Sequence, residues 1–310
     1  MKKKVKVFAP ATVANVGCGY DVLGFALHNP GDEVVMTGNE SGNVTLDHIE
    51  GDDGLLPRDP DKNIVTAVVK YYLEKTGIHQ GVSVKLYKKM PFGSGLGSSS
   101  ASAVAGLVAI NELMGNLLTR EELLPLAMEG ERLGCGNAHA DNVAPSLLGG
   151  VVLIRSYDPL DIIRLPFPDN LYCGILYPHI EIPTLQARKI LKTNVAITDA
   201  IKQWGNIGGL VAGFCMRDLQ LIGRSLEDHI IEPVRAMLIP HFYEMRSIAM
   251  ENNAIGFGIS GSGPSVFTFC ENKEEAGTIL EKQKEKLKGD GIDANAYYSA
   301  INPLGATVES

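Results

Sequence analysis

Residues 91–115 read PFGSGLGSSSASAVAGLVAINELMG, a loop with alternating glycines that runs into three serines and a long run of small and apolar residues. Gly93, Gly95 and Gly97 let backbone N–H groups converge on an anion, because no Cβ atom blocks the approach. A helix predicted from about residue 99 to residue 114 adds the partial positive charge of its N-terminus. The stretch therefore predicts a phosphate site, although a tight strand-to-helix turn packed against a sheet has the same glycine spacing.

Two common phosphate motifs do not match this loop. The Walker loop requires a lysine directly after G-x-x-x-x-G, and no lysine follows any such spacing here. The dinucleotide motif G-x-G-x-x-G fails at Ser98. That spelling does occur at residues 256–261, but a proline and a β-rich run follow it where a dinucleotide site needs a helix. The loop must therefore hold its anion in another way.

Composition indicates a soluble globular protein with an acidic surface. The 310 residues carry 28 basic and 36 acidic side chains, a formal net charge of −8, which argues against nucleic acid or an anionic membrane as a partner. The five cysteines are scattered without a C-x-x-C pair, so they form neither a disulfide framework nor a zinc site, and they suit a reducing cytoplasm. The longest apolar run covers about half of a membrane span. We therefore expect a cytoplasmic protein.

Outward from the loop, local signals predict helices and strands in mixed order. The first strand is expected to end at Pro10, and a helix over residues 63–76 to close at Gly77. Thr119 and Glu122 have the spacing of a capping box at the start of another helix. This mixture indicates an α+β fold rather than a regular alternation of strand and helix.

The second half of the chain has a different texture. Three prolines over residues 157–171 indicate a crossover, which places a first domain at residues 1–157 and a second at 158–310. Helices are expected near 184–192, 206–222, 240–251 and 272–288, with a strand–turn–strand unit over residues 255–270.

Two further segments concentrate polar side chains. In residues 9–24, Asn15 and Asp21 flank a glycine turn, which is also ordinary turn chemistry. In residues 129–150, a His–x–Asp pair follows a glycine-rich break. The pair lacks a third ligand at a zinc spacing, and no G-x-S-x-G elbow supports a serine hydrolase. Arg188 and Arg235 lie on predicted helices, where they either face solvent or bind a carboxylate or phosphate.

The three glycine-rich segments together resemble a known superfamily. PFGSGLGSSSA, residues 91–101, looks like the phosphate loop of the GHMP kinases, which include galacto-, homoserine, mevalonate and phosphomevalonate kinases. APATVANVGCGYDVLGFAL, residues 9–27, resembles their first motif, and GISGSGPSVF, residues 258–267, resembles their third. The three occur in the right order across nearly the whole chain. HADNVAP followed by LLGG, PTLQARKIL and EPVRAMLIP are most similar to segments of homoserine kinases.

The resemblance implies a fold and a reaction. The fold is a two-domain α+β GHMP fold, with an N-terminal domain similar to domain 2 of ribosomal protein S5 and a ferredoxin-like C-terminal domain. The reaction is transfer of the ATP γ-phosphoryl group to the side-chain hydroxyl of L-homoserine, a step of threonine biosynthesis. Mg²⁺ is the expected metal, and a homodimer is the expected assembly.

The resemblance also assigns residues. Ser99 and Glu131 match the positions that hold Mg²⁺ in the family. Backbone amides, the helix dipole and the metal would then neutralise the phosphate charge in place of a loop lysine. The residues assigned to ATP are Asn63, Pro91, Phe92, Gly93, Ser94, Gly95, Leu96, Gly97, Ser98, Ser99, Ser100 and Ala101. Those assigned to homoserine are Asn15, Asp21, His139, Asp141, Thr184, Arg188 and Arg235.

Catalysis is expected to proceed without a side-chain base. Mevalonate-type relatives carry an aspartate near the substrate hydroxyl, and the matching position here is Asn142, which cannot usefully accept a proton. We assign the adjacent Asp141 to the substrate ammonium. Two alternatives stay open: a kinase for another small alcohol such as shikimate or mevalonate, and a catalytically silent sensor. Paired aspartates and arginines favour an amino acid, and retention of Ser99 and Glu131 favours an enzyme.

Overall fold

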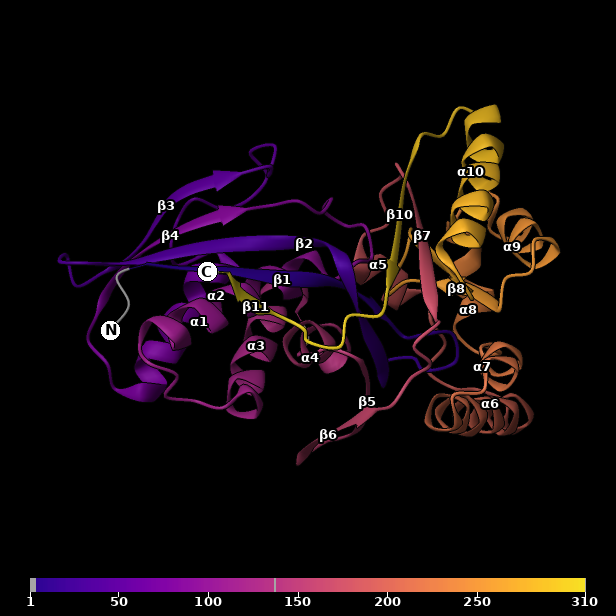
Figure 1. Cartoon of the computed structure of the whole chain (residues 1–310), viewed down its shortest axis with the longest axis horizontal. Helices are drawn as coiled ribbons and strands as arrows, with labels where there is room; N and C mark the ends of the chain where they lie inside the picture. The colour runs from indigo at the N-terminus through magenta and orange to yellow at the C-terminus, as the bar shows by residue number, and fades with distance from the viewer. Residues whose placement is uncertain (1–3, 137, 310) are drawn as a thin grey trace.

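The computed structural model of the chain describes residues 4–136 and 138–309, and these form two β-sheets placed side by side along the long axis of the molecule (Figure 1). The first sheet has seven strands in the order β11-β1-β2-β4-β3, with β5 paired to β2 and β6 paired to β5. All its pairs are antiparallel except the parallel pair of β3 and β4. Its strands are β1 (Lys4–Ala14), β2 (Leu23–Asn39), β3 (Val44–Glu50), β4 (Gly81–Tyr87), β5 (Val151–Tyr157), β6 (Leu160–Leu165) and β11 (Thr307–Glu309).

The expected end of the first strand at Pro10 is wrong. Strand β1 continues to Ala14, and its pairing with β2 shifts register between Pro10 and Thr12. Proline is tolerated at such irregularities, because the N–H that it lacks is not required there. The extension carries Thr12 and Ala14 into the region beside the glycine loop.

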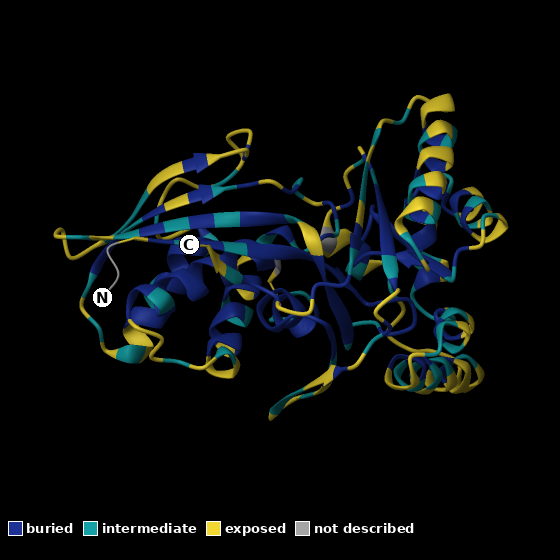
Figure 2. Ribbon diagram, in the orientation of Figure 1, coloured by how far each residue is buried: buried dark blue, intermediate teal, exposed yellow. Residues whose placement is uncertain are grey.

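Four helices cover one face of the first sheet (Figure 1). They are α1 (Ile64–Thr76), α2 (Ser98–Leu113), α3 (Arg120–Cys135) and α4 (Ala140–Leu148). Helices α1, α2 and α4 contact the strands of the sheet, and α3 packs on these three helices. Gly77 ends α1 with φ 68°, and the predicted capping box of Thr119 and Glu122 is present at α3. Helix α2 begins one residue before its expected start. It is buried along almost its whole length, as its small residues require for close packing (Figure 2).

The second sheet has the strand order β10-β7-β9-β8, all antiparallel. Together with the helices between its strands, it follows the β-α-β-β-α-β pattern of a ferredoxin-like domain. Helices α9 (Phe242–Glu251) and α10 (Lys273–Gly289) pack on it, and the outer face of α10 is exposed (Figure 2). The strands are β7 (Tyr172–Pro178), β8 (Gly256–Ile259), β9 (Val266–Cys270) and β10 (Ala294–Ala300).

The single helix expected over residues 206–222 is in fact two. Helix α6 (Ile197–Met216) ends at Arg217, whose φ is 56°, and α7 (Leu219–Ser225) begins directly after it. Asp218 caps α7 by accepting a hydrogen bond from the Leu221 N–H, so a side chain replaces the missing helical partner. Three short elements complete the half: α5 (Thr184–Lys189), α8 (Glu232–Arg235) and η1 (Ala236–Leu238).

Two strand pairings cross the domain boundary expected after residue 157, and that boundary stays a prediction. Strand β6 forms a hairpin with β5 in the first sheet, and β11 returns to pair with β1 in the same sheet. The first sheet therefore takes its strands from the chain up to Leu165 and from the last strand, β11. The halves share core contacts, because Phe25 of β2 packs against Phe267 and Phe269 of β9 with ring centroids 6.3 and 5.2 Å apart.

In the part of the chain that the structure describes, no helix has both the length and the apolar character to cross a membrane.

Candidate active site

A cavity of about 410 Å³ contains side chains from both halves of the chain. One end is bounded by the glycine loop and the first turn of α2. The other end is bounded by charged residues from the β1–β2 connection, α4, α5 and α8. Residues assigned from the sequence that line the cavity are Asn15, Asp21, Asn63, Phe92, Gly93, Ser94, Gly95, Gly97, Ser98, Ser99, Ser100, Glu131, His139, Asp141, Asn142, Arg188 and Arg235.

The glycine loop fits between two neighbouring segments that leave no room for side chains. Gly95 and Gly97 have φ values of 78° and 65°, a region that favours glycine. A Cβ atom on Gly97 would lie 2.2 Å from the Thr12 hydroxyl oxygen, and one on Gly95 would lie 2.4 Å from the Ser260 carbonyl oxygen. These positions therefore need glycine for space as well as for backbone conformation.

The three glycine motifs are joined by hydrogen bonds. The Ser260 hydroxyl donates to the Gly95 carbonyl at 2.8 Å. Asn15 donates from Nδ2 to the Gly261 carbonyl at 2.6 Å, and the Gly261 N–H donates to the Ala14 carbonyl at 3.1 Å. The third motif therefore links the phosphate loop to the first motif, and its residues Gly261 and Ser262 also line the cavity.

Ser99 and Ser100 lie in the first turn of α2 and both donate to the same carboxylate. Their hydroxyls lie 2.9 and 2.6 Å from Oε1 of Glu131, which is buried on α3. The N-terminal end of α2 thus carries serine hydroxyls and a carboxylate beside backbone N–H groups that point into the cavity end. This arrangement places acceptors for a cation next to donors for an anion.

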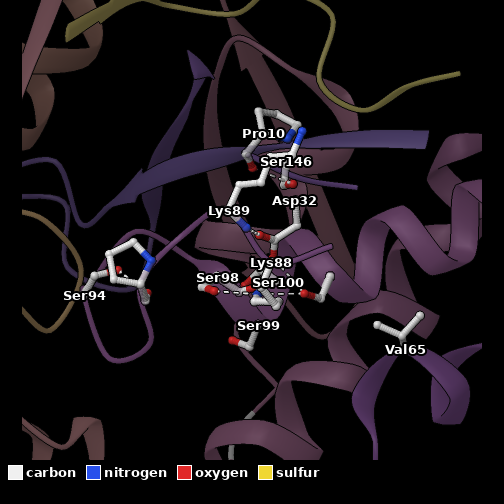
Figure 3. A network of polar contacts seen from close by, with 12 residues as sticks. Pro10, Asp32, Val65, Lys88, Lys89, Ser94, Ser98, Ser99, Ser100 and Ser146 are labelled. Carbon is white, nitrogen blue, oxygen red and sulfur yellow. Dashed lines mark hydrogen bonds and ion pairs between the residues drawn. The ribbon is translucent and has the colours of Figure 1, made fainter. Parts of the chain in front are cut away.

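Behind these serines lies a buried ion pair that the sequence analysis missed (Figure 3). Lys88 follows β4, and its ammonium pairs with the fully buried Asp32 of β2. It also donates to the carbonyl and hydroxyl oxygens of Ser98 at 2.9 and 2.6 Å and to the Ser102 hydroxyl at 2.9 Å. Burial lowers the pKa of Lys88, while Asp32 opposes that shift. In sequence, Lys88 is one of two consecutive lysines at a strand end, a pattern that usually indicates a solvated turn.

The charged end of the cavity contains a closed ion pair. Arg188 of α5 binds Asp21 through both terminal nitrogens, at 3.1 and 3.0 Å. Asn15 accepts a hydrogen bond from the Asp21 N–H at 3.0 Å and so fixes the backbone beneath the carboxylate. Asp21 and Arg188, both of which the resemblance assigns to homoserine, therefore neutralise each other in this structure.

Tyr20 is a second residue that the sequence analysis did not single out. Its ring lies beneath the guanidinium groups of both Arg188 and Arg235, at 5.5 and 5.0 Å from the ring centroid. Arg235 is buried and donates to the carbonyl oxygens of Gly261 and Ala187 at 3.1 and 3.3 Å. The aromatic ring holds two cations side by side at the cavity wall. The sequence feature that could have identified Tyr20 is its position directly before Asp21 in the first motif.

Asp141 and His139 have perturbed acidities. Burial, helped by the negative charges of Asp21 and Glu131, raises the pKa of Asp141 to about 7. Burial also lowers the pKa of His139, whose ring nitrogens make no hydrogen bond within the described residues. His139 is therefore neutral near pH 7, and Asp141 is close to half-ionised. Both belong to the turn before α4 or to its first turn, so one short segment supplies both groups.

Some residues assigned to ligands have other surroundings. Leu96 and Ala101 are fully buried and do not line the cavity, and neither does Pro91. Asn63 does line it, but its side chain caps α1 through Val65 and also donates to the Pro57 carbonyl at 2.9 Å. The Thr184 side chain, assigned to the substrate, lies outside the described part of the structure.

Comparison with known proteins agrees with this geometry. The family model for the GHMP kinases N terminal domain matches residues 63–150, and the model for GHMP kinases C terminal matches residues 210–289. A homoserine kinase of Chloroherpeton thalassium is 46% identical over 99% of both chains. One of Chlorobium phaeobacteroides strain BS1 is 49% identical over 93% of this chain and 95% of its own.

Solved structures give the same result. The crystal structure of a homoserine kinase from Cytophaga hutchinsonii superposes with a TM-score of 0.97 and 53% identity, covering all of this chain and 98% of that one. A mevalonate kinase of L. major superposes with a TM-score of 0.76 at 15% identity, covering 97% and 98% of the two chains. The second likeness concerns the fold alone. With its two family-model matches and its full-length relatives, the chain belongs to the homoserine kinase family of the GHMP kinases.

Proposed function

We propose that this chain transfers the γ-phosphoryl group of ATP to the side-chain hydroxyl of L-homoserine. The observation that carries the proposal is one shared cavity, which has the N-terminus of helix α2 at one end and paired aspartates and arginines at the other. A phosphate donor and a zwitterionic acceptor would therefore meet within one cavity. The product, O-phospho-L-homoserine, would serve threonine biosynthesis.

The phosphate end is suited to ATP through its backbone. The N–H groups of the loop and of the first turn of α2 offer donors to the phosphate oxygens, and the helix dipole favours their charge. In the transfer, the bond between the γ-phosphorus and its bridging oxygen breaks, and a bond from the homoserine hydroxyl oxygen forms. The hydroxyl proton passes to water. Positioning and charge stabilisation supply most of the rate in such a loose transition state.

Mg²⁺ fits the residues at this end. Mg²⁺ sites in kinases use one or two carboxylates, with phosphate and water oxygens completing the shell. Ser99 and Glu131 provide a hydroxyl and a carboxylate oxygen within 2.9 Å of each other. In the described part of the chain, no three His, Cys, Asp or Glu side chains group into a metal site. When bound, Mg²⁺ would neutralise phosphate charge.

The other end is suited to an amino acid. Arg188 and Arg235 present two guanidinium groups over Tyr20, a geometry suited to a carboxylate. Asp21 and Asp141 supply negative charge for an ammonium. Asp21 and Arg188 are paired with each other in this structure. A zwitterionic ligand can take the place of both partners, because its ammonium would pair with Asp21 and its carboxylate with Arg188. Shikimate and mevalonate carry no ammonium and so could not pair with Asp21.

We further propose that no side chain acts as a general base. Asn142 occupies the position beside the phosphate loop where a base would be needed, and an amide does not accept a proton. Asp141 has the acidity of a general base, with a pKa of about 7, but lies at the end assigned to the ammonium. The pH dependence of kcat and of the KM for homoserine separates these two roles.

The first test is ADP release from Mg-ATP with L-homoserine, L-threonine, L-serine, shikimate and mevalonate as acceptors. Turnover with homoserine alone is expected. Turnover with shikimate or mevalonate would retain the kinase but overturn the amino-acid end. Binding of ATP without turnover on any acceptor would favour a sensor.

A further inference from the structure

Thr12 is a fully buried residue of β1 whose hydroxyl points at the active site rather than into the apolar core. Its Oγ1 donates to Oδ1 of Asn142 at 2.7 Å, and its N–H donates to the Leu96 carbonyl at 3.1 Å. Thr12 therefore touches both the phosphate loop and the start of α4. A buried hydroxyl is usually retained for the hydrogen bond that it makes, because the core could accommodate a methyl group instead.

The bond fixes the orientation of the Asn142 amide. Because Oδ1 accepts the Thr12 proton, the donor Nδ2 takes the opposite side of the amide plane. Within the described residues, Nδ2 donates to no protein acceptor. Asn142 is half-buried and lines the cavity, so its N–H protons are available to a ligand there.

The location of this donor is the junction of the two ends of the cavity. A Cβ atom on Gly97 would lie 2.8 Å from Oδ1 of Asn142, so the amide packs directly against the last glycine of the phosphate loop. The next residue toward the N-terminus is Asp141, at the amino-acid end. The phosphoryl group must pass through this junction as it moves from ATP to the acceptor hydroxyl.

We propose that Thr12 is a positioning residue, which holds Asn142 with its N–H directed at an oxygen of the phosphoryl group during transfer. The inference rests on the proposed kinase function. The phosphoryl oxygens retain negative charge while the bond to the bridging oxygen breaks and the bond to the acceptor oxygen forms. A donor held in place before the reaction stabilises that charge without reorganisation. With the amide turned over, Oδ1 would face the same oxygens and repel them.

A purely structural role for Thr12 makes a different prediction. Valine has nearly the shape of threonine, so Thr12→Val would change packing little but would remove the hydroxyl. If Thr12 only fills space, Thr12→Val leaves kcat unchanged. If it orients Asn142, kcat falls, and Thr12→Ser, which keeps the hydroxyl, restores it.

The experiment is a double-mutant cycle on the full chain, with kcat and both KM values measured for Thr12→Val, Thr12→Ser, Asn142→Ala and the Thr12→Val/Asn142→Ala pair. We expect kcat to fall about 100-fold in Asn142→Ala and about 10-fold in Thr12→Val, with each KM within about twofold of the parent. In the Asn142→Ala background, Thr12→Val should change kcat less than about twofold, because its effect passes through the missing amide.

The kinetics are measured with the acceptor that the parent enzyme phosphorylates in the ADP-release test. The result therefore does not depend on homoserine being the correct acceptor. Thermal unfolding of each variant accompanies the kinetics. Equal and independent losses from Thr12→Val in both backgrounds would overturn the proposal. An unchanged kcat in Thr12→Val, or a rise in the KM for ATP as its sole effect, would overturn it too.

Discussion

The two ends of the cavity differ in whether backbone groups or charged side chains line them. The phosphate end consists mainly of backbone: a loop of alternating glycines and the first turn of α2, supported by the buried Lys88–Asp32 pair. The amino-acid end consists of charged side chains carried by four separate segments, with Asp21 and Arg188 already paired. A backbone site tolerates little change in shape, whereas a side-chain site changes specificity through single substitutions. Substitutions at the phosphate end should therefore reduce activity through steric clashes, and substitutions at the amino-acid end should reduce it through loss of charge.

The largest expected effect tests the steric end. Gly97→Ala should lower kcat/KM for ATP by more than about 100-fold, because its Cβ atom would lie 2.2 Å from the Thr12 hydroxyl and displace the loop that positions the phosphates. The matched control is Gly93→Ala. Gly93 shares the positive φ but has open space around its Cβ position, so the backbone strain is common to both. Equal losses in the two variants would show that backbone strain, not close approach, sets the effect.

At the charged end, Arg235→Leu should raise the KM for homoserine about 50-fold and leave kcat within a few-fold. A carboxylate clamp acts alike in the ground and transition states, so its loss appears in KM. Steady-state kinetics with homoserine varied at saturating ATP measure both values. Arg224→Leu, on α7 outside the cavity lining, is the control. An unchanged KM in Arg235→Leu would remove Arg235 from the substrate site.

The pH dependence separates binding from proton transfer. The pKa of Asp141 is about 7, so its carboxylate is charged above that pH and neutral below it. If it binds the ammonium, the KM for homoserine should rise about tenfold for each pH unit below 7 and level off above it, while kcat changes little. In Asp141→Asn this dependence should disappear from a KM that is already high. An acidic limb in kcat that vanishes in Asp141→Asn would instead identify Asp141 as a general base.

The smallest effect concerns the serine hydroxyls. Ser99→Ala should lower kcat about fivefold, the value of one hydrogen bond or weak ligand, and raise the Mg²⁺ concentration needed for half-maximal rate. Binding of Mg-ATP, measured by calorimetry, gives a readout independent of turnover. Ser83→Ala, on β4 outside the cavity lining and bonded to Asn39 and Thr45, is the control. An unaltered Mg²⁺ requirement in Ser99→Ala would leave Glu131 as the residue to test.

Sequence reasoning succeeded where the signal is local. Gly77, the Thr119–Glu122 capping box and the loop before α2 each depend on neighbours within a few residues, and each has the predicted structure. It failed at the break between α6 and α7, where Arg217 adopts a left-handed conformation that glycine usually signals.

The candidate site shows the same division. Most of the residues that the motifs assigned to the site line one cavity, but the motifs did not reveal Lys88. A buried lysine is recognised by partners such as Asp32, which lies 56 residues earlier, and that separation has no local pattern. Tyr20 and Thr12 lie within the first motif, yet only the three-dimensional structure shows which neighbours their side chains meet.

The return of β11 to the first sheet has a consequence for motion. The chain leaves the first sheet after Leu165 and comes back after Ala300, and Ile301 forms a β-bridge with Leu27 at the return. In Figure 1 the yellow end of the chain runs back beside β1. Two chain segments therefore connect the halves, and a relative movement of the halves must bend both segments at once. Such a pair of connections restricts how the halves can move relative to each other, so it helps to keep the arginines of the second half opposite the phosphate loop.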